Sequence, residues 1–270
     1  MARKSVLTAL SLFLGILGTC SCALGRPSHQ ATSEQAEIER FLASAQILSK
    51  AQPTEKGRND PWMVILGDGK TTRRAIFKYI DRPKPGALAS SYRHELAAYA
   101  LSKILGLDVV PPVVARRIEN LPGSLQVMVE GCITESERQK QYLSPPDPQA
   151  FSDAVAEVRV LEHLTHCERS DLGDMLIHKD TWKVCRVDFA EGFGPEAELL
   201  PEADIRRCSK RLYERLKSVP AKAIEETVRP HLERPEIEAL LARRKLILDR
   251  LDSLIKENGE AAVLFDIVRK

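Results

Sequence analysis

The sequence lacks the excess of basic residues that nucleic-acid-binding proteins normally have. It contains 40 lysine and arginine residues against 38 aspartate and glutamate residues in a chain of 270. Two of the basic residues, Arg3 and Lys4, lie within the first 25 residues, which contain no acidic residue. The two charges therefore balance in the rest of the chain, and we expect no nucleic-acid partner.

Cysteine motifs for a zinc site are absent as well, because no CxxC pair occurs in the sequence. One weaker candidate is an alternative metal site at His163, His166 and Cys167, since the two histidines share a helical face. It requires the three side chains to converge in space. The cysteines beyond the N-terminal region are widely spaced and indicate no known disulfide framework: Cys132, Cys167, Cys185 and Cys208.

Long apolar runs are missing except at the N-terminus, so we expect the body of the protein to be soluble. In residues 1–25, Arg3 and Lys4 precede the apolar run "SVLTALSLFLGILGTCSCALG". This layout is typical of a secretory signal. We expect the protein to be exported, with cleavage after Ala23 or Gly25.

Two other interpretations of this N-terminal run stay open. The stretch "LGTC", ending at Cys20, resembles a bacterial lipobox, and a lipid on Cys20 would hold the protein at the membrane. The run is also nearly long enough to remain as an uncleaved anchor. We expect a periplasmic or lipid-anchored protein with no other membrane contact, in which the polar residues 26–37 form a flexible tether.

Residues 38–130 have the pattern of several strands and one helix. The stretch "WMVILGDGKTTRRAIFKYID" predicts a β-hairpin with its turn at "GDG". A helix is predicted to start at Ser90 or Ser91, either of which can cap it, and to end at Gly106. Two further strands are predicted on either side of a turn at residues 120–123, "NLPG".

Residues 131–270 are mostly helical in pattern. The helix "AFSDAVAEVRVLEHLTH" precedes a charged loop and the strand "WKVCRVDF", and three amphipathic helices follow. A strand-rich part followed by a helix-rich part predicts an α+β protein with two lobes, an N-lobe over residues 38–130 and a helical C-lobe over residues 131–270.

Lys78 is the first candidate for chemistry. In the strand "AIFKYI" it alternates with apolar residues on one face, and the other face is apolar too. A lysine in a buried strand needs an anionic partner. Glu95, near the start of the next helix, is the candidate. The alternative is a lysine at a strand end whose ammonium reaches solvent.

An acidic loop is the second candidate. Glu168, Asp171 and Asp174 lie close together in sequence, and a strand then leads to Asp188. Four converging carboxylates would repel one another unless they surround a cation. The alternatives are a solvated acidic loop and, for Asp188, a turn cap.

The order of these elements matters more than any one of them. A strand lysine, a helix glutamate, a further helix, an acidic loop and an aspartate at a strand exit are the parts that a phosphoryl-transfer site uses. Such a site needs a lysine on the nucleotide phosphates, a carboxylate that orients the lysine, and ligands for Mg²⁺.

Several stretches also resemble a known superfamily: "AIFK", "HELAAYALSKILGLDVVPPVV", "GSLQVMVEG", "ERSDLGDMLI", "VCRVDFAEGF" and "GEAAVLF". From about Phe41 to the C-terminus the chain resembles the atypical kinase-like superfamily of HipA-type and phosphatidylinositol-kinase-like proteins. It is most similar to a group of uncharacterised bacterial proteins with that bilobal fold. The resemblance implies ATP and Mg²⁺ as cofactors.

By this resemblance, Lys78 and Glu95 would form the ion pair of the nucleotide site, and Asp188 would bind the metal. Asp174 would stand in the place of the metal-binding asparagine. The loop is one residue longer than the pattern of the superfamily, so the catalytic acid is either Glu168 or Asp171. No glycine-rich phosphate loop is evident either.

These departures predict an exported protein that binds nucleotide and divalent metal, with weak phosphotransferase activity toward an unknown protein or small-molecule acceptor. ATP is scarce outside the cytoplasm, which favours weak activity. The alternative is a non-catalytic, pseudokinase-like interaction module of the bacterial envelope, in which the same charged residues form structural ion pairs.

Overall fold

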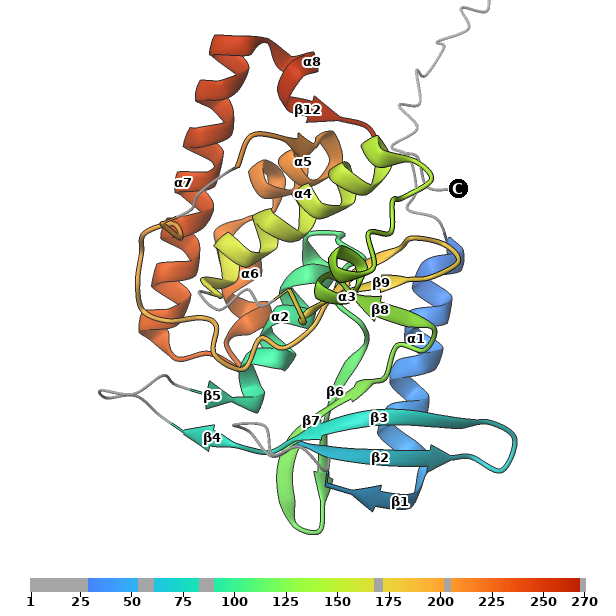
Figure 1. Ribbon diagram of the computed structural model, residues 1–270. Helices are drawn as coiled ribbons and strands as arrows, with labels where there is room; N and C mark the ends of the chain where they lie inside the picture. Colours follow the sequence, from blue (N-terminus) through green and yellow to red (C-terminus); the bar gives the residue numbers. More distant parts are fainter. Residues whose placement is uncertain (1–28, 53–60, 83–89, 168–171, 202–204, 268–270) are drawn as a thin grey trace, which may run out of the picture.

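The computed structural model describes residues 29–52, 61–82, 90–167, 172–201 and 205–267 (Figure 1). The predicted signal with Cys20 lies outside these residues, and so do Glu168 and Asp171. Within the described segments, no helix combines the length and the hydropathy that a membrane span requires.

A five-stranded antiparallel sheet forms the core of the N-terminal part (Figure 1). The predicted hairpin is confirmed: Trp62 pairs with Phe77 and Gly67 with Thr72. Asp68 closes its turn by accepting the backbone N–H of Thr71 at 2.7 Å. In sheet order the strands are β1 (Gln46–Ala51), β2 (Trp62–Gly67), β3 (Thr72–Lys78), β7 (Leu121–Val127) and β6 (Val113–Ile118).

The turn between β6 and β7 differs from the prediction of a turn at residues 120–123. The chain reverses at Glu119 and Asn120, which have φ values of 50° and 67°, and β7 already contains Pro122. Two-residue hairpin loops follow the strand twist when both central residues have positive φ, and asparagine tolerates this conformation. Of the motif "NLPG", only Asn120 therefore lies in the turn, and the other three residues begin β7.

Helix α1 (His29–Ser44) replaces most of the flexible tether that the polar residues 26–37 predicted. Its apolar side packs on one face of the sheet, where Leu42 is fully buried together with Val64 and Phe77 (Figure 1). Its polar side also forms a long-range hydrogen bond, in which Glu39 accepts from the hydroxyl of Tyr99 at 2.5 Å. Tertiary contacts of this kind stabilise helices whose sequence alone is marginal.

Helix α2 (Tyr92–Ile104) begins and ends where the sequence predicted. Ser91 caps it by accepting the N–H of Arg93, and Gly106 follows it with a φ of 70°. A short pair, β4 (Asp81–Arg82) with β5 (Ser90–Ser91), precedes the helix.

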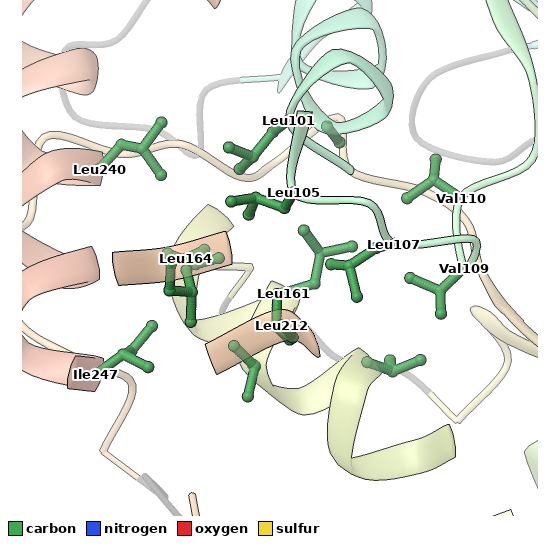
Figure 2. Close-up of a cluster of buried hydrophobic side chains, with 14 of the residues drawn as sticks. Leu101, Leu105, Leu107, Val109, Val110, Leu161, Leu164, Leu212, Leu240 and Ile247 are labelled. Atoms are coloured by element: carbon green, nitrogen blue, oxygen red, sulfur yellow. The ribbon is translucent and has the colours of Figure 1, made fainter. Parts of the chain in front are cut away.

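Helices make most of the C-terminal part. Leucine side chains of α2, α4, α5 and α7 meet in one core, including Leu101, Leu161, Leu212 and Leu240 (Figure 2). The helices are α3 (Glu135–Lys140), α4 (Pro148–Thr165), α5 (Lys210–Ser218), α6 (Ala221–Val228), α7 (Arg234–Asn258) and α8 (Glu260–Val263). The strands are β8 (Cys132–Thr134), β9 (Met175–His178), β10 (Val184–Arg186), β11 (Cys208–Ser209) and β12 (Leu264–Phe265).

The structure is thus the predicted α+β protein, with a strand-rich N-terminal part and a helical C-terminal part. The small sheet β10-β9-β8 lies at the start of the helical part (Figure 1). In this sheet β9 pairs with β8, the first strand after β7, and also with β10. Strand β10 leads directly into Asp188.

Replacing the buried Leu42 of α1 tests whether this helix is docked on the sheet. We expect Leu42→Ala to lower the free energy of unfolding by about 2–5 kcal/mol, because it removes a fully buried side chain and leaves a cavity. The matched control is Leu48→Ala, whose side chain is 54% exposed and whose loss should change stability by about 0.5 kcal/mol at most. Urea denaturation measures both, and equal effects would show that α1 is not docked.

Candidate active site

Lys78 at the end of β3 lies between two carboxylates. Its Nζ is 2.5 Å from Oε1 of Glu95 and 2.8 Å from Oδ1 of Asp188. The Lys78 side chain is 13% exposed and that of Glu95 is 2% exposed. The structure therefore brings together three of the six residues that the sequence singled out, from β3, α2 and the segment after β10.

The charge on Lys78 is stabilised by these neighbours. Burial acts to lower the pKa of Lys78, but the charges of Glu95 and Asp188 and their hydrogen bonds raise it above its ordinary value. An ammonium has three N–H donors, and two of them are engaged here. Among the described residues, Lys78 is thus a fixed positive charge with one N–H donor left for a further anionic group.

Glu95 connects the lysine to the Asp188 segment. Its Oε1 also accepts the backbone N–H of Phe189 at 3.1 Å. Its other oxygen, Oε2, is buried and has no hydrogen-bond partner within the described part of the chain. A carboxylate oxygen in this position can coordinate a cation, or it can accept a hydrogen bond from a water molecule bound to a cation.

Asp188 has a backbone conformation that is unusual for a residue other than glycine, with a φ of 62°. Such conformations persist where the surrounding structure enforces them, and they concentrate at functional sites. Here the next residues are held by the cap and the first turn of α2, because the carbonyl of Ala190 accepts the N–H of Ser91 at 2.8 Å and lies 2.9 Å from Nδ1 of His94.

The carboxylate of Asp188 is ionised and accessible. Burial acts to raise its pKa, but the charge of Lys78 and the hydrogen bond from it hold the pKa below the ordinary value. The side chain is nevertheless 45% exposed, so a ligand can reach this carboxylate.

Asp174 lies beside this segment, at the start of β9. Its carbonyl accepts the N–H of Val187 at 3.0 Å, and its carboxylate is 3.5 Å from Nη1 of Arg186. The Asp174 side chain is 23% exposed. Asp174 and Asp188 are therefore held by adjacent backbone segments as two accessible carboxylates.

Two carboxylates suit Mg²⁺, which keeps several waters and binds through one or two carboxylates plus substrate phosphates. The described residues contain no group of three or more histidine, cysteine, aspartate or glutamate side chains arranged to hold a metal on their own. A metal at Asp174 and Asp188 would therefore take its other ligands from a bound nucleotide and water. Glu168 and Asp171 lie outside the described residues, so the identity of the catalytic acid stays a prediction.

The alternative metal site at His163, His166 and Cys167 is not formed in the described structure. The thiol of Cys167 donates to the carbonyl of Asp188 at 3.8 Å, and burial raises its pKa to about 12. A metal-binding thiolate is thus disfavoured there. Nδ1 of His166 is 3.9 Å from Glu196, and Nδ1 of His163 is buried with no described partner. The helical spacing brings the two histidines near one another, but the three side chains do not converge on one metal position.

Arg186 is the residue that sequence reasoning missed. It is fully buried in β10, where its Nε donates to Glu162 at 2.9 Å and its Nη2 to the sulfur of Cys167 at 3.5 Å. Together with the contact to Asp174, these bonds join α4, the loop before Glu168 and the Asp188 segment. The signal was an arginine between apolar residues in the strand "WKVCRVDF".

No model of a known protein family matches the chain, and no curated protein does. Solved structures match its fold. Hydra Fam20, solved with sugar, has a TM-score of 0.66 at 16% identity, over 87% of this chain and 93% of that one. The Helicobacter pylori proinflammatory kinase CtkA has a TM-score of 0.50 at 12% identity, over 82% of this chain and 96% of that one.

The chain has an atypical kinase-like fold. The kinase-like resemblance predicted from the sequence is thereby confirmed at the level of the fold. In this kinase-like fold the cluster of Lys78, Glu95 and Asp188 joins the strand-rich part to the helical part. The closer resemblance to HipA-type proteins stays a prediction.

Removing the ammonium of Lys78 tests its structural role in the ligand-free protein. We expect Lys78→Met to lower the free energy of unfolding by about 3–5 kcal/mol, because Glu95 then remains buried without a cation. The control is Lys103→Met, which breaks a half-exposed pair with Glu39 and should cost about 1 kcal/mol or less. Chemical denaturation that gives the same small effect for both would contradict the buried pair.

The lowered pKa of Asp188 predicts a pH dependence. Its ionised form contributes stability above the ordinary aspartate pKa of about 4, and this contribution is lost as the pH falls through the lowered folded-state value. We expect Asp188→Asn to be less stable than the wild type at pH 6 and the difference to shrink below pH 4. Asparagine accepts the positive φ, so the backbone is retained. A difference that stays constant between pH 3 and 7 in urea denaturation would argue against this ion pair.

Proposed function

We propose that this protein is an exported, kinase-like protein that binds ATP together with Mg²⁺ and transfers the γ-phosphoryl group slowly. The observation that carries the proposal is the position of Lys78 between Glu95 and Asp188. A lysine fixed by a helix carboxylate is the group that holds nucleotide phosphates in phosphoryl-transfer sites.

The residues have distinct tasks in this proposal. Lys78 would donate its third N–H to a phosphate oxygen, while Glu95 keeps the ammonium in place. Asp188 and Asp174 would hold Mg²⁺. Oε2 of Glu95, which has no partner among the described residues, would accept a hydrogen bond from a water molecule coordinated to the ion. The ion itself would neutralise charge on the phosphates as the leaving group departs.

Slow transfer follows from the loop between Cys167 and Asp174. Whether Glu168 or Asp171 is the acid beside the acceptor, this loop is one residue longer than the pattern of the superfamily, and we infer that the extra residue misplaces the acid. A misplacement of about 1 Å costs roughly 10²-fold in rate. Export, which we propose from residues 1–25, would also place the protein where ATP is scarce.

One observation favours a second candidate, a non-catalytic interaction module of the envelope. Asp174 already faces the fully buried Arg186, which balances its charge without a metal. In that case Lys78 and Asp188 would form a structural ion pair, and ligand binding would be independent of Mg²⁺.

Calorimetric titration of the purified protein with ATP distinguishes the two candidates. We expect binding that requires MgCl₂ and that Asp188→Asn weakens about tenfold or more, because a charged ligand of the metal is lost. The control is Asp180→Asn, which changes an exposed residue of the β9–β10 turn and should bind as the wild type does.

Turnover of ATP, followed in the same samples, then measures the transfer step. Folded protein that binds none of ATP, ADP and GTP, with either Mg²⁺ or Mn²⁺, would rule out the nucleotide site and leave the interaction module.

A further inference from the structure

Gln126 in β7 has a buried amide nitrogen without a hydrogen-bond partner among the described residues. The residue is 9% exposed, and its Nε2 is buried with no hydrogen bond among the described residues. The amides of Gln35, Gln139 and Gln149 each donate to a carboxylate instead. Most buried polar groups have partners, so an exception calls for an explanation such as a ligand.

The register of the sheet places Gln126 on the same face as Lys78. Ile76 pairs with Gln126, and Lys78 pairs with Ser124. Directly paired residues have Cβ atoms roughly 5 Å apart, and diagonal neighbours such as Lys78 and Gln126 are roughly 7–8 Å apart. The amide therefore lies beside the proposed phosphate site, two residues further along β7 than Ser124, the partner of Lys78.

The same face carries apolar side chains that no core covers. Met63, Ile65 and Ile76 share it by the pairing of β2 with β3, and all three are only half-buried. They belong to neither hydrophobic core of the described residues, whereas the residues between them pack under α1. An apolar surface next to a polar group that lacks a partner is typical of a ligand site.

The direction from Lys78 to Gln126 also suits a nucleotide. Two residues along a strand span about 7 Å, and the next residues of β7 lead into the segment that joins the sheet to β8. A nucleotide whose phosphates lie at Lys78 and Asp188 would thus extend its base over Ile76 toward Gln126.

We propose that Gln126 determines the base specificity of this site by hydrogen bonding to adenine, with the ring packed on Met63, Ile65 and Ile76. This inference rests on the proposed nucleotide site. A carboxamide presents a donor beside an acceptor, which matches the amino and ring nitrogens of adenine. The paired acceptors of guanine, O6 and N7, suit arginine or lysine instead.

The test is calorimetric titration of the full chain and of Gln126→Met with ATP, GTP and inorganic tripolyphosphate, each with MgCl₂. Methionine keeps the shape of glutamine and removes its hydrogen-bonding groups. We expect wild-type protein to prefer ATP over GTP, and Gln126→Met to bind ATP about tenfold more weakly while losing that preference. Tripolyphosphate, which has no base, should bind both proteins equally.

Thermal unfolding of the free proteins separates this role from a structural one. Because Gln126→Met removes a buried donor that lacks a partner, its melting temperature should equal or exceed that of the wild type. Gln139→Met, which removes an amide bonded to Glu135, is the matched control and should leave the affinity for ATP unchanged.

Two results would overturn the inference. Wild-type protein that binds ATP and GTP equally, or a Gln126→Met protein that retains the preference for ATP, would show that Gln126 does not contact the base. Wild-type protein that binds neither ATP nor tripolyphosphate would instead refute the nucleotide site itself. Should Gln126→Met fail to fold, Gln126→Leu and the wild-type comparison of ATP with GTP decide the question.

Discussion

The buried ammonium of Lys78 is the charge on which the arrangement of the site depends. It donates hydrogen bonds to two carboxylates from distant segments, Glu95 and Asp188, and so joins a strand, a helix and a loop at one point. Burying any of these charges alone would be costly, and only their convergence offsets the loss of hydration. The strand-rich and helical parts are therefore coupled at this point by ion pairs.

Two buried arginines support this point from the helical side. Arg186 connects Glu162, Cys167 and Asp174, and Arg243 of α7 donates from Nε to the carbonyl of Leu164 at 3.0 Å. Arg243 also donates to the carbonyls of Gly194 and Glu196, so it joins α7 to the end of α4 and to the segment that follows Asp188. Rigid support of this kind is what a binding site needs if its charged groups are to keep their positions.

The sequence was informative where a local pattern carried the signal. Alternation identified Lys78 as a buried strand lysine, and an acid at a strand exit identified Asp188. Helix α1 was missed because its stability comes from contacts with residues far along the chain, such as Tyr99. Arg186 and Gln126 were missed because their meaning depends on which strands pair and in what register, which a single sequence does not contain.

The docking of α1 has a consequence for the order of folding. The guanidinium of Arg116 donates to the carbonyls of Leu42 and Ala45, which lie 74 and 71 residues earlier. During synthesis, the apolar side of α1 emerges before the strands that bury it. Long-range contacts of this kind slow folding and leave apolar surface exposed in the meantime. Helix α1 is thus enclosed only after β6 and β7, the strands that it contacts, have been synthesised.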